Sequence, residues 1–310
     1  MLVNGTWTKD YHPVQGTDKK GGFVRKDSSF RGWLGSEEFP IERGRYHLYI
    51  ALICPWASRA LALKNLKGID DELLPVTVTE PFLTDQGWHF GDFPGASGAD
   101  PVLGASYLHE HYTLAAADYT GRATVPVLWD KKNNTIVNNE SSEVIKMLNS
   151  EFDALLPQDK AVFDLYPEEL REAIDGFNAD IYPTVNNGVY RVGFATTQEA
   201  YDEAFDILFD KLDEIEARFA DGRSFVHGDR MTLSDIHLFP TLIRFDVAYH
   251  GLFKANRQRI ADYEHLNAYV QRMMDIPEIA ASVNIDHIKT GYYSIKALNP
   301  SQIVPKGPQI

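Results

Sequence analysis

The order of predicted strands and helices in the first half of the chain constrains its fold more than any other feature. Residues 45–53 form an apolar and aromatic run that is typical of a β-strand. Pro55 then favours helix initiation, and 57–67 has the apolar spacing of a helix, followed by a second predicted strand at 73–79. A β-α-β unit of this kind predicts parallel strands joined by a right-handed crossover.

A second block of predicted elements follows a loop-rich stretch at 80–121, which is too long to be a plain connection. Two short strands are predicted at 124–129 and 135–138, and a helix begins at 141 and runs to 149. Pro126 inside the first strand requires an edge position, a bulge or a cis peptide bond before it. The order β-α-β and then β-β-α predicts a thioredoxin-like α/β domain.

The second half of the chain has almost no strand pattern and predicts an all-α helical bundle. Helical spacing of apolar residues appears at 177–190, 198–219, 234–249 and 261–274. Thr232 and Asp235 form a variant capping box before the third of these helices. The predicted organisation is an N-terminal extension wrapped over the domain at 1–42, a thioredoxin-like domain at 43–150, an all-helical domain at 151–295 and a C-terminal tail at 296–310.

Charge and hydropathy exclude several classes of partner. The net charge of −14, with scattered basic residues, argues against a nucleic-acid partner, which requires a concentrated basic face. No apolar run approaches the roughly 20 residues that cross a bilayer. Residues 1–20 are polar and carry no signal-peptide pattern, so we expect a cytoplasmic protein without membrane attachment.

The number of cysteines excludes intramolecular disulfides and cysteine zinc sites. Cys54 is the only cysteine, so the chain forms no intramolecular disulfide and no cysteine zinc site. His109 and His111 flank Glu110, but this spacing lacks the HExxH geometry of a zinc helix. We therefore expect both histidines on the surface and no metal cofactor.

Cys54 itself is the strongest chemical signal in the sequence. A lone cysteine is usually a small buried hydrophobe, but this one ends a strand and begins a helix, where backbone N–H groups and the helix dipole favour an anion. Such positions lower the pKa of a thiol and make it a nucleophile. Ala57 occupies the place of a second thiol in a dithiol motif, so a mixed disulfide at Cys54 would require an outside thiol for its release.

The chain resembles the glutathionyl-hydroquinone reductases, also called Xi-class glutathione transferases, over nearly its whole length. The resemblance rests on sequence segments beginning at Phe23 (FVRKDSSFRG), Cys54 (CPWA), Gly121 (GRATVPVLWD), Asn139 (NES), Asn186 (NNGVYRVGFA), Arg244 (RFD) and Asp286 (DHI), and on Tyr292–Tyr293. It implies the glutathione transferase architecture, with glutathione as co-substrate, glutathionylated hydroquinones as substrates and a homodimer.

The resemblance also implies which residues bind glutathione. The main chain of Val125, ahead of a cis Pro126, would pair with the tripeptide as an added strand. Glu140 and Ser141 would hold the γ-glutamyl ammonium and carboxylate, although the residues alone indicate a helix cap. Further contacts are implied from Arg122 and Trp88, for which a surface arginine and a core tryptophan are the alternatives.

Three tyrosines match family positions beside the quinone. Tyr190 would donate a proton to the leaving aromatic ring, and Tyr249 and Tyr292 would stabilise the Cys54 thiolate. Without the resemblance, aromatic residues at helical spacing indicate a core. Tyr293 is an alternative to Tyr292, because an alignment shift of one residue exchanges them.

The expected reaction is the reduction of a glutathionyl-hydroquinone through a Cys54–glutathione mixed disulfide, with release of oxidised glutathione. A broader thioltransferase or dehydroascorbate reductase would use the same cysteine, and a non-enzymatic ligand-binding protein could share the fold.

Overall fold

The computed structural model describes residues 1–8 and 16–308, whose contacts divide the chain into two units. The first unit contains the described residues of Met1–His12 together with Ser28–Phe163 and Ala281–Ser294, and the second contains those of Pro13–Asp27, Asp164–Ala280 and Ile295–Ile310. Ala281–Ser294 therefore packs with the first unit, although it falls in the segment predicted as the all-helical domain. The predicted domain boundaries remain predictions.

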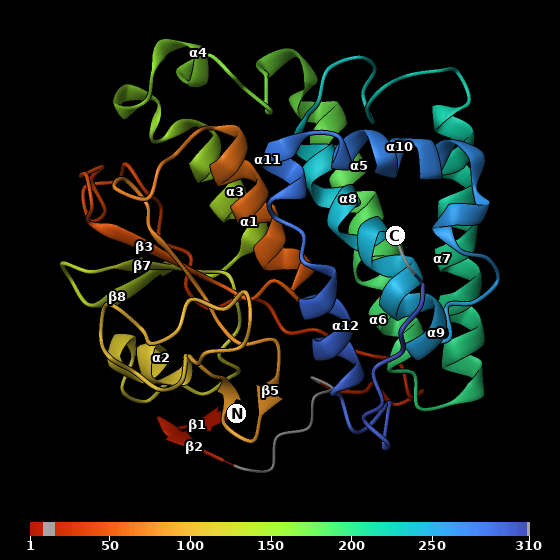
Figure 1. Cartoon of the computed structure of the whole chain (residues 1–310), viewed down its shortest axis with the longest axis horizontal. Coiled ribbons are helices and arrows are strands. Elements are labelled where there is room, and N and C mark those ends of the chain that lie inside the picture. Colours follow the sequence, from red (N-terminus) through yellow and green to blue (C-terminus); the bar gives the residue numbers. More distant parts are fainter. Residues whose placement is uncertain (9–15, 309–310) are drawn as a thin grey trace. The chain divides into compact units, whose positions relative to one another are not determined.

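A four-stranded mixed sheet forms the centre of the first unit (Figure 1), with the strand order β4-β3-β7-β8. Its strands are β3 (Tyr46–Ile50), β4 (Val76–Val78), β7 (Val127–Asp130) and β8 (Thr135–Asn138). β3 and β4 are parallel, with Leu48 opposite Val76, and β7 is antiparallel to both of its neighbours. The predicted parallel β-α-β unit and the thioredoxin-like order are confirmed.

Helices cover both faces of this sheet, which explains why β3 reads as a continuous apolar run. All five residues of β3 are buried. Figure 1 shows α1 (Pro55–Leu66) and α3 (Ser141–Ser150) on one side of the sheet and α2 (His109–Ala115) on the other. α1 and α3 contact each other, so the elements that begin at the Cys54 and Ser141 positions are neighbours.

The peptide bond between Val125 and Pro126 is cis. Of the alternatives that Pro126 left open, this structure has the cis bond, and β7 begins one residue later at Val127. Proline therefore stays outside the central strand, where it would interrupt the ladder of hydrogen bonds.

The loop-rich stretch at 80–121 contains a short hairpin and α2, and one prediction for it is wrong. The hairpin is formed by β5 (Leu83–Thr84) and β6 (Gly87–Trp88). His111, expected on the surface, is fully buried because α2 packs it edge-on against the ring of Trp129 in the sheet. Burial lowers the pKa of His111 to about 4, so its imidazole is neutral at physiological pH.

Two parts of the predicted N-terminal extension, near Leu2 and near Gly32, form main-chain hydrogen bonds with later segments of the first unit. β1 (Leu2–Val3) and β2 (Thr6–Trp7) form a small hairpin, and the Leu2 N–H donates to the Gly121 carbonyl over 2.9 Å. The Gly32 N–H donates to the Val137 carbonyl over 2.8 Å, which aligns this part of the chain with β8.

The second unit is helical within the residues that the structure describes. Its α-helices are α5 (Arg171–Ile181), α6 (Gly188–Gly193), α7 (Gln198–Phe219), α8 (Leu233–Arg244), α9 (His250–Leu252), α10 (Glu264–Met274) and α11 (Pro277–Ala280). Two π-helical segments, Tyr182–Asn186 and Phe245–Tyr249, interrupt the predicted continuous helices at 177–190 and 234–249. The predicted capping box of Thr232 and Asp235 opens α8.

Shorter helices complete the two units. They are α4 (Gln158–Ala161), α12 (Ile285–Tyr293) and 3₁₀ turns at Asp153–Leu155, Glu168–Leu170 and Ile260–Asp262. Across residues 1–8 and 16–308, the structure contains no helix whose length and apolar character would allow it to span a bilayer.

Candidate active site

Cys54 is the N-cap residue of α1 in the first unit. Its backbone is extended (φ −79°, ψ 118°), and its carbonyl accepts the first helical hydrogen bond, from the Ser58 N–H at 3.0 Å. Pro55 occupies the first helical turn, where a missing N–H removes no helical bond. The half-buried thiol therefore lies at the helix end that favours negative charge.

Val125 faces the thiol from the segment that precedes β7. The Cys54 Sγ lies 3.6 Å from the Val125 carbonyl oxygen, to which the thiol donates. Within the described part of the chain, no hydrogen bond uses the Val125 N–H. A second extended chain can use that N–H as a donor, which is what pairing with a peptide requires.

Glu140 and Ser141 lie at the N-terminus of α3. Glu140 is the N-cap, and its carboxylate accepts from the Ser142 N–H at 3.1 Å and from the Ser28 hydroxyl at 3.1 Å. Ser141 is buried, with only 4% of its surface exposed. The capping role indicated by the residues is therefore present, and the carboxylate is held in place at a helix end that also favours anions.

Arg59 is a residue that the sequence analysis missed. It lies on α1, is 2% exposed, and its Nη1 donates to the Ser141 hydroxyl over 3.4 Å. Its guanidinium carbon lies 4.5 Å from the centroid of the Trp56 ring, a cation–π contact next to Cys54 in the chain. Its positive charge therefore adjoins the hydroxyl that the resemblance assigns to the γ-glutamyl carboxylate.

Tyr292 belongs to α12, which packs in the first unit beside Cys54. A Cβ on Gly291 would lie 2.4 Å from the Cδ1 of Ile53, so α12 packs tightly against the residue before the cysteine. Tyr292 is 3% exposed. Tyr293 is half-buried, and burial raises the pKa of its hydroxyl.

Tyr190 and Tyr249 lie together in the second unit. Their ring centroids are 6.0 Å apart, and both rings contact Phe253 at 5.6 and 5.1 Å. Tyr249 is fully buried at the end of a π-helical segment, whereas Tyr190 is half-buried in α6. The guanidinium carbon of Arg25 lies 4.8 Å from the Tyr190 ring centroid, a cation–π contact.

Trp88 and Arg122 also belong to the first unit. Trp88 lies in β6, and Arg122 lies between α2 and β7. Trp88 is 7% exposed in β6, and its carbonyl accepts from the Leu108 N–H over 3.0 Å, which fits the alternative of a core tryptophan. Arg122 is half-buried, and together with burial it lowers the pKa of the Met1 ammonium. Glutathione contacts from these two residues remain predictions.

The part of the chain that the structure describes contains no candidate metal-binding site. No group of three or more histidine, cysteine, aspartate or glutamate side chains within residues 1–8 and 16–308 could hold a metal ion. The first unit instead offers one thiol, one unused main-chain donor and a helix N-terminus, which suit a peptide-like thiol ligand.

Comparison with protein families finds two matches that together cover most of the chain. A family described as glutathione S-transferase, N-terminal domain, matches residues 53–151, and the glutathione S-transferase, C-terminal domain, matches 198–272.

Individual proteins match over nearly the full length. The chain is 47% identical over 312 residues to glutathionyl-hydroquinone reductase PcpF of Sphingobium chlorophenolicum, covering 99% of this chain and 96% of that protein. It is 43% identical to glutathionyl-hydroquinone reductase YqjG of Escherichia coli, covering 99% and 95%.

Solved structures give the same grouping. The glutathione S-transferase Xi of Phanerochaete chrysosporium superposes with a TM-score of 0.92 at 45% identity, covering 94% of this chain and 95% of that one. The glutathione-bound structure of YqjG has a TM-score of 0.88 at 40% identity, covering 100% and 96%.

Proposed function

The chain belongs to the glutathione transferase superfamily, within its Xi class of glutathionyl-hydroquinone reductases, and on that premise we propose that it reduces glutathionyl-hydroquinones through a Cys54–glutathione mixed disulfide. It is a glutathione-dependent oxidoreductase of this superfamily. The observation that carries the mechanism is the Cys54 thiol at the N-terminus of α1, 3.6 Å from the Val125 carbonyl.

Glutathione binds along the first unit in this proposal. The cysteinyl part of the tripeptide pairs with the Val125 main chain, whose N–H is unused within the described residues, and this pairing brings its sulfur to Cys54. The γ-glutamyl ammonium pairs with Glu140, and its carboxylate binds at Ser141 and the N-terminus of α3. The buried Arg59 beside Ser141 adds a positive charge that favours that carboxylate.

In the first half-reaction, the Cys54 thiolate attacks the sulfur of the glutathionyl-hydroquinone thioether. A sulfur–sulfur bond forms, and the bond between sulfur and the ring carbon breaks with both of its electrons moving to the ring. The ring carbon takes a proton, so the aromatic product leaves as the hydroquinone. The sulfur is oxidised to the disulfide level, and the ring is reduced.

Tyrosine hydroxyls supply the proton and stabilise charge. Tyr190 donates the proton to the ring carbon, and the cation–π contact with Arg25 holds its ring. In the roles that the family resemblance implies, the hydroxyls of Tyr292 and Tyr249 donate hydrogen bonds to the Cys54 thiolate.

The second half-reaction restores the enzyme with an external thiol. A second glutathione thiolate attacks the mixed disulfide, forms oxidised glutathione and releases the Cys54 thiolate. The net reaction converts one glutathionyl-hydroquinone and one glutathione into one hydroquinone and one oxidised glutathione. The single cysteine of the chain requires this external step.

Steady-state kinetics test the proposal. With glutathionyl-menadiol and glutathione, the wild type should give ping-pong kinetics, and Cys54→Ala should lose turnover by at least about 10³-fold because no other thiol exists to form the intermediate. Normal turnover by Cys54→Ala would exclude the mechanism. Comparing glutathionyl-menadiol with a small mixed disulfide separates this activity from a broader thioltransferase.

The remaining assignments extend the same proposal. Trp88 and Arg122 contribute to glutathione binding, and Arg122 pairs with a glutathione carboxylate. A homodimer and a cytoplasmic location remain expectations from the family.

A further inference from the structure

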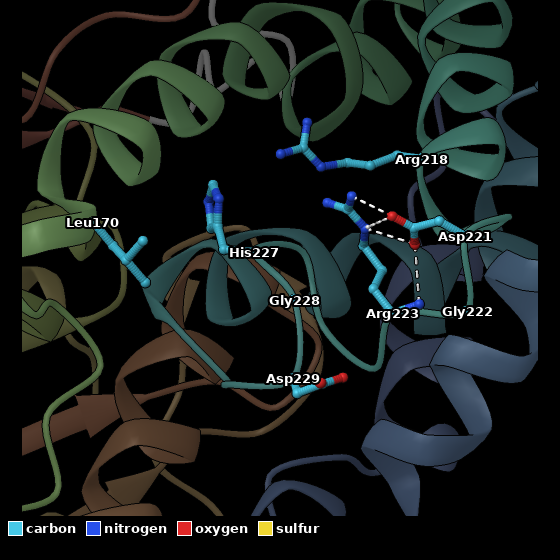
Figure 2. Close-up of a pocket in the computed structure, with 8 residues that line it drawn as sticks. All are labelled: Leu170, Arg218, Asp221, Gly222, Arg223, His227, Gly228 and Asp229. Atoms are coloured by element: carbon cyan, nitrogen blue, oxygen red, sulfur yellow. Dashed lines mark hydrogen bonds and ion pairs between the residues drawn. The ribbon is translucent and has the colours of Figure 1, made fainter.

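A separate pocket lies in the helical unit, where the end of α7 leads through a loop into α8 (Figure 2). Its volume is about 490 Å³, within the range of small-molecule sites. The pocket is lined by Leu170, Arg218, Asp221, Gly222, Arg223, His227, Gly228 and Asp229. Side chains built on either glycine would meet no atom within 4 Å, so the space beside both residues is open.

Two guanidinium groups converge at this pocket. The Nε of Arg218 and the Nη1 of Arg223 both donate to the Val226 carbonyl, over 2.9 and 3.1 Å. This shared acceptor holds two positive charges within about 6 Å of each other. Burial lowers the pKa of Arg218, and the positive charge of Arg223 lowers it further.

Arg223 forms an ion pair with Asp221, whereas Arg218 feels the charge of the same carboxylate but forms no ion pair within the described residues. Arg223 directs its Nε and Nη2 toward Asp221, and Figure 2 shows this carboxylate on the side of Arg223 away from His227. Arg218 makes a cation–π contact with Phe177, but its Nη1 and Nη2 donate to no acceptor within the described residues. Its terminal N–H groups are therefore available to a ligand.

His227 reports the sign of the local field. Its Nε2 lies 2.9 Å from the Ser234 hydroxyl, which fixes the ring at the edge of the pocket. The pKa of His227 is lowered to about 4, first by burial and then by the charges of Arg218 and Arg223. The charges that act on the imidazole are both positive, so the potential at this place favours an anion.

We propose that this pocket binds the oxyanion group, phosphate or carboxylate, of a small molecule. Arg218 offers a planar fork of N–H donors to two oxygens of the ligand, and the Nη1 of Arg223 lies beside it. Figure 2 shows the Asp229 carboxylate at the opposite end of the lining from the two guanidinium groups. The site is independent of the chemistry at Cys54.

NMR titration of the full-length protein tests the proposal. Inorganic phosphate and succinate, added separately at low ionic strength and constant pH, distinguish a phosphoryl site from a carboxylate site. We expect saturable shifts of the His227 imidazole signals with at least one of the two anions. Arg218→Gln should weaken that binding about 10- to 100-fold, because it removes the charged donor fork.

Arg259→Gln is the matched control. Arg259 pairs with Asp262 through the same two guanidinium nitrogens that Arg223 uses for Asp221, but Arg259 does not line the pocket. The control variant should bind the anion as the wild type does. The absence of saturable binding by either anion, or equal affinity in the wild type and Arg218→Gln, would overturn the proposal.

Thermal unfolding provides a second readout that also reports folding of the variants. A saturating anion should raise the melting temperature of the wild type by mass action and should not raise that of Arg218→Gln. Arg218→Lys keeps the charge but loses the fork, so we expect binding between those of the wild type and Arg218→Gln. Binding by Arg218→Lys as strong as by the wild type would refute the fork, and an equal rise in the melting temperatures of the wild type and a folded Arg218→Gln would refute the site.

Discussion

Replacing Gly291 with alanine tests how closely α12 packs beside the cysteine. The added Cβ would lie 2.4 Å from the Cδ1 of Ile53 and 2.6 Å from the Pro81 carbonyl oxygen. Both distances are far below van der Waals contact. Ile53 can change its rotamer, but the Pro81 carbonyl belongs to the backbone, so we expect α12 to move away and to carry Tyr292 with it.

The size of the effect follows from two opposing terms. Alanine is favoured over glycine inside a helix by about 0.5–1 kcal/mol, whereas overpacking of a tight contact costs about 1–3 kcal/mol. Gly291→Ala should therefore lower the free energy of unfolding by about 1–2 kcal/mol. Gly176→Ala in α5 is the control, because a Cβ there meets no atom within 4 Å, and it should raise that free energy by up to about 1 kcal/mol.

Urea unfolding followed by circular dichroism measures the stability of both variants. In the proposed mechanism kcat depends on the Tyr292 hydroxyl, so kcat with glutathionyl-menadiol reports a displacement of Tyr292. We expect Gly291→Ala to lose kcat and Gly176→Ala to retain it. Adding Ile53→Val removes the clashing Cδ1 methyl and should restore part of the loss, since the contact with the Pro81 carbonyl remains. If Gly291→Ala is as stable and as active as Gly176→Ala, the close packing of α12 is refuted.

The other predictions concern the tyrosine assignment and the capping box of α8. Tyr292→Phe should lower kcat about 10-fold or more and Tyr293→Phe should change it little, whereas the reverse ranking would assign the role to Tyr293. Asp235→Ala leaves the buried N–H groups of Val226 and Thr232 without their acceptor, so urea unfolding at pH 7 should show a loss of about 3 kcal/mol or more, and a loss under 1 kcal/mol would contradict the buried cap. Burial raises the pKa of Asp235 from 3.8 to about 6, so the stability gained from its protonation in the folded state is complete below about pH 4 and is lost as the pH rises through about 6, whereas its role as a hydrogen-bond acceptor persists at pH 7. The free energy of unfolding of the wild type relative to Asp235→Asn should therefore fall by about 3 kcal/mol between pH 4 and 7, and a flat difference would refute the raised pKa.

Local sequence signals predicted the main elements because each element is consistent with its own residues. The buried strand β3, the proline at the start of α1 and the capping box of α8 all specify their elements without distant contacts. The packing of α12 could not be predicted in this way, because helical spacing does not identify the partner of a helix. Its partner depends on Gly291, whose missing side chain allows contact with Ile53.

Similar reasoning explains the residues that sequence analysis missed. The sequence predicts His111 at the surface, but α2 forms within the long loop and buries the ring against the sheet. Arg59 was overlooked because an arginine on a helix usually faces solvent, and only the packing of α1 against α3 places it beside Ser141. The one signal for Arg59 was a basic residue in the first turns of a helix, where acidic residues are normal.

The sequence predicts Cys54 as the reactive group because it is the only cysteine and lies at a strand-to-helix junction, and the structure confirms its position at the start of α1. The main-chain donor at Val125 could be inferred only through the resemblance, since a free N–H has no signature in side-chain patterns.

Intact-protein mass spectrometry of a single turnover tests the central claim most directly. The reduced protein is mixed with glutathionyl-menadiol in the absence of free glutathione and quenched with acid. The account predicts one glutathionyl group on Cys54, in equal amount to the menadiol released, which disappears when glutathione is added and never forms on Cys54→Ser. Release of menadiol by the wild type without a glutathionyl adduct on Cys54 would contradict it.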